Sequence, residues 1–162
     1  MNSLRSAHLT RCAVFHDISE EMIEGLRSHE RIVSFAEGHE LFERGQPADE
    51  LLILQEGVVE LFFPVRIMGA TRELTMESKQ PGDVVAWSSL VSPYRFTLSA
   101  RCASKCTLLG LHRDAVQAFF ESNPQVGYLF MRNLAGVIGR RLQAMQTIWM
   151  HDIQASTAKH MG

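Results

Sequence analysis

The segment from Pro81 to Cys106, PGDVVAWSSLVSPYRFTLSARCASKC, gathers side chains suited to holding a small molecule. The hydroxyl groups of Ser88 and Ser89 and the guanidinium of Arg95 could donate hydrogen bonds to an anion. The indole of Trp87 stands among them. It offers either a flat wall for an aromatic ligand or a core side chain that fills the space. A Pro-Gly-Asp turn and short strand-like stretches on either side indicate a loop held by β-structure.

Patterns typical of catalysis or of a metal centre do not accompany this segment. The seven histidines are scattered, with no His-x-His, His-Glu-x-x-His or Cys-x-x-Cys spacing, and there is no Gly-x-Ser-x-Gly elbow. A haem sensor would need an axial His or Cys near the longest helix, and we find no convincing candidate. We therefore expect a protein that is not an enzyme.

Three cysteines, Cys12, Cys102 and Cys106, make an odd number that argues against a disulfide framework. If Cys102 and Cys106 lie on one strand, they are about 13 Å apart. That is too far for a disulfide or a shared metal, unless the chain turns near Lys105. We expect small, buried, reduced thiols.

Length and charge limit the possible partners. A chain of 162 residues fits one domain with a real core. Sixteen basic against eighteen acidic residues leave no basic excess for nucleic acid, so direct nucleic-acid binding is not expected. No apolar run is long enough for a membrane span and no signal peptide is visible, so we expect a cytoplasmic protein without membrane contact.

Most of the chain between residues 31 and 111 alternates apolar and polar side chains. Short runs are separated by turn residues at intervals of about seven to twelve positions, which is typical of an antiparallel barrel, roll or sandwich. Beyond the first alternating stretch, 31–63, strands are expected at about 72–77, 96–103 and 107–111, with a hairpin end at 64–70 that carries Gly69.

Helical spacing flanks this β region on both sides. Ser19 can cap a short helix that ends near Ser28, after an earlier helical turn before Phe15. A second short helix is expected in HRDAVQAFFESNP, where Asn123-Pro124 stops it.

The longest periodic segment runs from Gln125 to about Ile153. So small a β domain cannot cover a helix of this length, so part of its apolar stripe should meet a second copy of the chain. The alternative, a stripe packed on its own barrel, holds best for the first two turns. The expected dimer residues are Leu134, Ile138, Leu142, Met145, Ile148 and Trp149. We assign 1–150 to the domain, including this helix, and 151–162 to the helix end and a flexible, frayed tail.

One stretch, FAEGHELFERGQPADELLILQEGVVEL, resembles the signature of the cyclic-nucleotide-binding family, the sensor domain of catabolite-activator and FNR-type regulators. The family pattern is Gly-x-x-[ILV]-[FI]-x-x-Gly, then Ala-Asp, then a strand ending in Gly-x-[VI]-x-[VIL]. The resemblance covers residues from about 12 to 150. It implies a mainly β fold with flanking helices: an antiparallel β-roll (double-stranded β-helix, cupin-like jelly roll) with N-terminal helices and a long C-terminal helix.

The resemblance also implies a ligand cassette after the Pro-Gly-Asp turn. In the family, a Gly-Glu pair binds the phosphate through backbone N–H groups and the ribose through the Glu, and a later Arg pairs with the phosphate. Here these positions fall on Ala86 and Trp87, and neither matches. Alignment through Cys106 puts the Arg position on Phe96, whereas one residue of slack puts it on Arg95. Because successive strand residues face opposite sides, this choice decides whether Arg95 enters the pocket.

The expected function is a sensor or regulatory domain that binds a small effector and signals through a dimer helix. The effector is a cyclic nucleotide such as cAMP, or another small anionic or aromatic ligand, and no other cofactor is expected. The alternative is a scaffold dimer with a vestigial, ligand-free pocket. The family's transcription factors carry a helix-turn-helix after the long helix. This sequence ends before one, so a protein partner or a longer product is implied. The candidate ligand-binding residues are Gly82, Ala86, Trp87, Ser88, Ser89, Arg95, Phe96 and Thr97.

Overall fold

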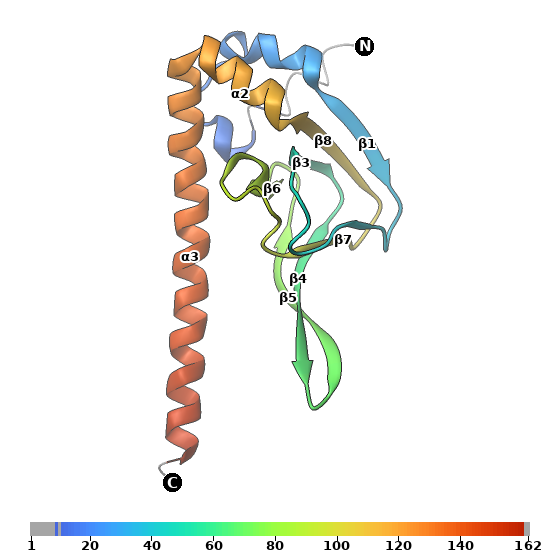
Figure 1. Cartoon of the computed structure of the whole chain (residues 1–162), viewed down its shortest axis with the longest axis vertical. Coiled ribbons are helices and arrows are strands. Elements are labelled where there is room, and N and C mark those ends of the chain that lie inside the picture. Colours follow the sequence, from blue (N-terminus) through green and yellow to red (C-terminus); the bar gives the residue numbers. More distant parts are fainter. Residues whose placement is uncertain (1–8, 10, 161–162) are drawn as a thin grey trace.

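The computed structural model describes residues 9 and 11–160. A β-roll stands beside one long helix, whose C-terminal end extends beyond the tip of the β4–β5 hairpin, residues 59–79 (Figure 1). The helices are η1 (Ala13–Phe15), η2 (Glu21–His29), η3 (Ser88–Leu90), α2 (Arg113–Ser122) and α3 (Pro124–His160). The strands are β1 (Arg31–Phe35), β2 (Glu40–Phe42), β3 (Glu50–Glu56), β4 (Val59–Ile67), β5 (Ala70–Lys79), β6 (Val84–Ala86), β7 (Ser99–Cys102) and β8 (Cys106–His112).

The strands form two four-stranded sheets, in the orders β1-β8-β3-β6 and β2-β7-β4-β5, and every pairing is antiparallel. Consecutive strands alternate between the sheets or join as hairpins, so the chain rolls up into a jelly roll. The predicted fold class, a mainly β roll with N-terminal helices and a long C-terminal helix, is confirmed.

Two apolar cores hold the molecule together. One lies between the sheets, with Phe42, Leu61 and Leu108 among its buried members. The other lies between the outer face of the first sheet and the helices, where Phe15 and Phe130 meet edge to face. Neighbouring residues of one strand enter different cores, as Leu108 and Leu109 of β8 do, because successive strand side chains point to opposite faces.

The hairpin of β4 and β5 reaches beyond the rest of the roll (Figure 1). Its turn is Met68-Gly69, both with positive φ, at the end of the predicted hairpin region. Pro64 lies within β4 rather than in the turn, and β4 pairs with β7 only from Val59 to Phe62. The strand therefore continues through the proline as a two-stranded ribbon.

The predicted N-terminal helices are present as 3-10 turns. The Ser19 hydroxyl accepts a hydrogen bond from the Met22 N–H at 3.3 Å, which is the expected capping contact. The strand expected at 96–103 is shorter in the structure, where β7 covers only Ser99–Cys102. The residues before it form a loop, in which Arg95 makes an isolated β-bridge to Pro47.

The prediction of a frayed tail is wrong for residues 154–160, because α3 continues to His160. The Thr157 hydroxyl donates to the Ile153 carbonyl at 2.8 Å, and two alanines favour the helix. Apolar periodicity ends near Ile153, but a solvated helix does not require it. Residues 161–162 of the expected tail lie outside the described residues.

The chain does turn near Lys105, so the straight-strand separation of Cys102 and Cys106 does not apply. Cys102 ends β7 and Cys106 begins β8, and both thiols are buried, as is Cys12. Burial first, and then a hydrogen bond with the Cys106 thiol, raise the pKa of Cys102 to about 12. Burial also raises the pKa of Cys12 to about 11. The expectation of small buried thiols is confirmed.

Candidate ligand site between the roll and the long helix

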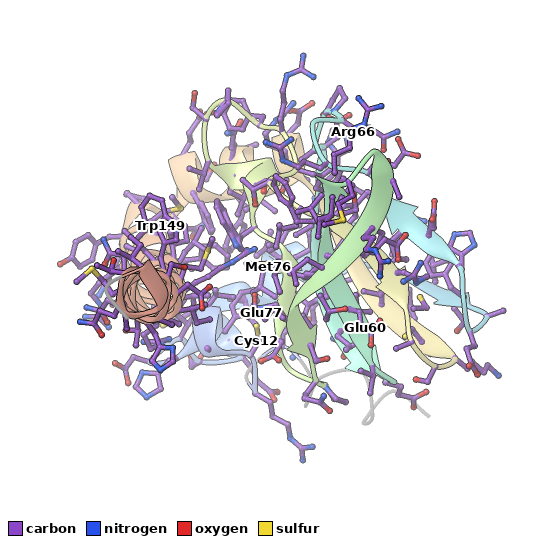
Figure 2. All side chains as sticks on the ribbon, turned by 90° about the horizontal axis from the view of Figure 1, so that it is seen from below. Cys12, Glu60, Arg66, Met76, Glu77 and Trp149 are labelled. Atoms are coloured by element: carbon purple, nitrogen blue, oxygen red, sulfur yellow. The ribbon has the colours of Figure 1, made fainter. Side chains whose placement is uncertain are left out.

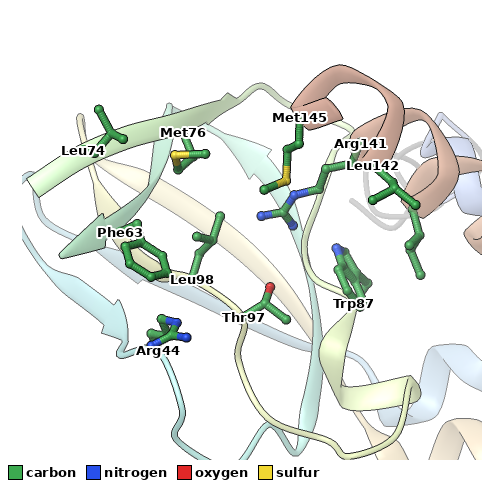
Figure 3. A pocket seen from close by; sticks show the side chains of 11 residues that line it. Arg44, Phe63, Leu74, Met76, Trp87, Thr97, Leu98, Arg141, Leu142 and Met145 are labelled. Atoms are coloured by element: carbon green, nitrogen blue, oxygen red, sulfur yellow. The ribbon is translucent and has the colours of Figure 1, made fainter. Parts of the chain in front are cut away.

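A hollow of about 480 Å³ lies between the β-roll and α3. The hairpin of β4 and β5 forms one wall, the cassette segment forms the floor and α3 forms the opposite wall (Figure 3). This volume is in the ordinary range for a small-molecule site. Its lining residues are Arg44, Phe63, Leu74, Met76, Trp87, Thr97, Leu98, Ile138, Arg141, Leu142 and Met145.

A second, inner recess lies deeper in the roll, behind Trp87 and Thr97, and it is nearly filled. Its free volume is about 10 Å³, no more than one water molecule needs. The rings of Phe42 and Phe96 are stacked there at 3.8 Å between centroids. Ser88 also faces this recess. Phe96 thus occupies space that the resemblance assigned to a ligand.

Trp87 borders both spaces. Its indole packs partly against the core beneath the helices, lines the inner recess and forms part of the floor of the outer hollow. Trp87 is therefore a core side chain that also lines an open hollow, and its role as a ligand wall stays a prediction. It helps to close the inner space and leaves the outer one open.

Arg95 does not enter either space. Its side chain is exposed, and its Nη1 donates to the Gly45 carbonyl at 2.8 Å. The isolated bridge to Pro47 fixes the backbone beside it. The Arg95 side chain therefore stabilises the loop at Gly45 through this hydrogen bond. Of the two alignments left open by the sequence, the one that puts Phe96 and not Arg95 at the recess agrees with this geometry.

Some of the other cassette candidates have a structural role, and others line the recess or the hollow. Gly82 has φ of +94° in the turn before β6 and lines neither space, so its role is conformational. Ala86 is buried at the end of β6, and its carbonyl accepts a hydrogen bond from the Ser89 hydroxyl at 3.4 Å. Thr97 lines both spaces. Of the eight candidates, only Trp87 and Thr97 reach the open hollow.

The cation of the hollow comes from the long helix. Arg141 projects from α3 toward Thr97 and Leu98 (Figure 3), and its side chain is only 15% exposed. Its Nε lies 3.5 Å from Glu77 Oε2, and its guanidinium is 5.8 Å from the Trp87 ring centroid. Within the described part of the chain, no hydrogen bond to this guanidinium is found.

Sequence reasoning missed Arg141, although a signal existed. It lies seven residues after Leu134 and therefore on nearly the same helix face as that fully buried leucine. A charged residue at a buried helix position calls for a partner or a function.

The positive charges around Arg141 outnumber the negative ones. Burial lowers the pKa of its guanidinium, and the nearby Glu77 carboxylate partly opposes that shift. Glu77 is already bound through Oε1 to the buried ammonium of Lys79, and its Oε2 has no hydrogen-bond partner in the described structure. Figure 2, seen from below along α3, shows Met76 and Glu77 on the side of the roll that faces the helix. One carboxylate thus faces two buried cations.

Arg44 is a second cation at the opposite rim. Its guanidinium lies 4.5 Å from the centroid of the Phe63 ring, and its side chain is exposed (Figure 3). Solvent can therefore balance its charge, which is not so for Arg141.

The residues predicted to form a dimer helix are not equivalent. Leu134 is fully buried in the core of its own chain, so its assignment to a partner contact is wrong. Ile138, Leu142 and Met145 line the hollow. Ile148 and Trp149 are 55% and 71% exposed beyond it.

No group of three or more metal-ligating side chains is found among residues 9 and 11–160. Across those same residues, no helix has both the length and the apolar character needed to cross a membrane.

A β-roll with a ligand-sized hollow against a long C-terminal helix defines a sensor domain of the type found in catabolite-activator-like regulators. The chain belongs to the cyclic nucleotide-binding domain family, which matches residues 32–123. It is 25% identical over 153 residues to a CRP-like cAMP-activated global transcriptional regulator of Mycobacterium tuberculosis, covering 94% of this chain and 67% of that protein.

Solved structures are similar to the same extent. The N-terminal domain of a transcriptional regulator from Streptomyces coelicolor A3(2) is 27% identical, with a TM-score of 0.69 over 85% of this chain and 94% of that one. The Thermus thermophilus catabolite activator protein is 25% identical, with a TM-score of 0.68 over 85% of this chain. The chain spans 61% of the length of that protein.

Proposed function

We propose that this domain is a non-enzymatic sensor that binds a small effector in the hollow and reports its presence through α3. One observation carries the proposal: the hollow is of ligand size, and it is lined by a mostly buried arginine that makes no hydrogen bond to any described residue. A buried cation that lacks full compensation is costly, and such groups concentrate at binding sites.

The helix wall supports a signalling role. Arg141, Leu142 and Met145 line the hollow, and the next turns of the same helix carry the exposed apolar residues Ile148 and Trp149. A ligand that favours one position of Arg141 also favours one position of α3, and so shifts a pre-existing equilibrium of helix packing.

A second copy of the chain is the proposed partner of this exposed helix face. Every described residue from Leu142 to Ala158 is exposed. Leu142, Met145, Trp149 and Ile153 recur at intervals of three or four, which makes one continuous apolar stripe. Two such stripes can cover each other in a symmetric dimer. The stripe includes Leu142 and Met145, which also line the hollow. A movement of α3 at the hollow would therefore also move the surface that contacts the partner.

Trp87 provides a direct test of ligand binding. The chain has two tryptophans, so a Trp149→Phe variant leaves Trp87 as the only indole reporter. Titration with cAMP, cGMP and a set of small aromatic carboxylates should change its fluorescence saturably for at least one compound. At about a hundred times the dissociation constant, that compound should also stabilise the fold by about 2.7 kcal/mol. If every compound leaves both the fluorescence and the melting temperature unchanged, the scaffold alternative replaces the sensor.

The dimer is tested separately by light scattering after gel filtration. Trp149→Glu should shift the protein toward a monomer, because it puts a charge in the centre of the apolar stripe. His151→Glu places the same charge two residues further on, about 200° around the helix, and should leave the dimer intact. A wild-type protein that is monomeric at high micromolar concentration would refute the proposed partner.

A further inference from the structure

We propose that the effector is an organic monoanion with a flat apolar body, such as an aryl carboxylate, and that Arg141 of α3 binds its anionic group. The inference rests on the proposed function, because it names the ligand class for the same hollow. It also moves the anion receptor from the β-roll cassette to the long helix.

The inner recess excludes a ligand that needs the cassette. It holds about 10 Å³ of free space, because Phe96 is stacked on Phe42 and Trp87 borders it. A ribose with two hydroxyl groups needs a hydrogen-bond acceptor, and an indole can only donate. Arg95 is held outside by the Gly45 carbonyl. A nucleotide therefore lacks the room it would require there, although Ser88, Thr97 and Arg141 also line this recess.

Arg141 selects for negative charge. Its guanidinium is mostly buried and has Glu77 at 3.5 Å as its only ion-pair partner among the described residues. Because Glu77 also neutralises Lys79, the three side chains carry a net charge of about +1. A carboxylate in the hollow would supply the missing charge and could accept two parallel N–H bonds from the guanidinium.

The remaining walls select for an apolar body. Eight of the eleven lining side chains are apolar, and they include Phe63 on one side and Trp87 on the other. Met76 and Met145 provide adaptable thioether contacts between them. Thr97 is the one uncharged polar side chain in the lining, so a ligand rich in hydroxyl groups would lose hydrogen bonds on entry.

One negative charge is sufficient. Arg44, the other cation of the lining, is exposed and remains solvated, so it does not demand a second anionic group. The Arg141–Glu77 pair already joins α3 to β5, so a ligand carboxylate that shares Arg141 with Glu77 acts directly on this contact.

The test is calorimetric titration of the full chain with three probes: 2-naphthoate, its neutral isostere 2-naphthamide, and cAMP. Naphthoate should bind, and the amide should bind about tenfold to hundredfold more weakly, because a hydrogen bond between charged groups is lost. This comparison uses only wild-type protein, so it does not depend on the folding of any variant.

Two variants then locate the anion. Arg141→Gln should weaken naphthoate about tenfold to hundredfold and leave the amide nearly unchanged. Arg140→Gln removes the same charge from the adjacent exposed position and should change neither affinity by more than about twofold. Circular dichroism melts establish that both variants are folded.

The outcomes separate the ligand class from the proposed function. Binding of cAMP without naphthoate, or equal binding of naphthoate and naphthamide, overturns the aryl-carboxylate assignment and leaves a sensor domain. Naphthoate binding that Arg141→Gln does not weaken overturns the assigned receptor. If no probe binds the folded wild-type protein, the aryl-carboxylate assignment is overturned, and the sensor function is decided separately by the Trp87 fluorescence titration with the wider set of compounds.

Discussion

The inner recess and the outer hollow share four lining residues, Trp87, Thr97, Leu98 and Arg141, but they are packed differently. The inner recess is nearly filled, chiefly by the stacked rings of Phe42 and Phe96, and is too small for a ligand. The outer one keeps about 480 Å³ open and contains a buried, incompletely compensated arginine. Cores are filled to near crystal density, so an open space with a half-paired charge is unlike a core.

In the proposed function, the outer hollow takes the binding role and the inner recess is filled. Large side chains in the roll, Phe96 and Trp87, stabilise the fold by filling the recess. The helix, which lies outside the roll, can then supply the polar group without disturbing the packed interior. The comparison predicts large stability effects for changes on the closed side and small ones on the open side.

The largest effect is expected for Phe42→Ala. The ring is 8% exposed and stacked on Phe96, so its loss leaves a cavity in the core between the sheets and should cost about 3–5 kcal/mol. Phe63→Ala is the matched change on the partly exposed wall of the hollow and should cost about 1–2 kcal/mol. Urea unfolding measures both. Equal costs would show that the two spaces are not differently packed.

Two glycines outside both spaces show a related contrast, between a crowded position and an open one. Gly57 has φ of +90°, and a Cβ there would lie 2.3 Å from the Lys105 carbonyl oxygen, which is backbone and cannot move aside easily. Gly57→Ala should cost about 2–4 kcal/mol from strain and crowding together. Gly45 has φ of +87°, but a Cβ added there would have no atom within 4 Å. Gly45→Ala should therefore cost only about 1 kcal/mol. Denaturant midpoints that fall equally for both would contradict this contrast.

The roll could be predicted from the sequence because its signals are local. Alternating strands, and glycines such as Gly45 and Gly57 at positive φ, act within a few residues. The departure at Trp87 was also visible, since it depends on position within a motif. Arg141 was not found, because its environment arises only when α3 lies beside β5, 64 residues earlier at Glu77. The seven-residue spacing from Leu134 indicates a buried helix face, but it does not identify Glu77 as the neighbour of Arg141.

Helix length and the cysteine pair show two further limits. Apolar periodicity reports what a helix buries, so it ended near Ile153 although the solvated helix continues to His160. The turn between Cys102 and Cys106 contains Ala103, Ser104 and Lys105, which have no glycine or proline to mark it.

The free energy of unfolding should also decrease at alkaline pH, because Cys102 is buried in the interior. Because the folded pKa of Cys102, about 12, is above the value near 8.5 of an unfolded thiol, the folded state binds its proton more tightly. The stability that Cys102 contributes is therefore complete below about pH 8.5 and is lost as the pH rises toward the folded value. The loss should approach about 1.4 kcal/mol for each pH unit in that window. Urea unfolding of wild type and Cys102→Ala at pH 8 and pH 10 measures it. The variant should have the shallower pH dependence, and equal slopes would contradict the burial of this thiol as the cause.

The smallest effect on stability is expected for a substitution of Arg141, for which we expect the largest effect on ligand binding. In Arg141→Met, the thioether keeps most of the packing against Trp87 and Leu98, while Glu77 retains its bond to Lys79. Burying an incompletely paired guanidinium costs solvation energy, and replacing it with an apolar side chain of similar length is often neutral. The free energy of unfolding should change by no more than about 1 kcal/mol, measured by urea denaturation beside Arg140→Met as the exposed control. A loss above about 3 kcal/mol would mean that Arg141 supports the fold through its pair with Glu77. A small change, together with lost affinity for an anionic probe, would show that the charge is maintained at α3 for the ligand.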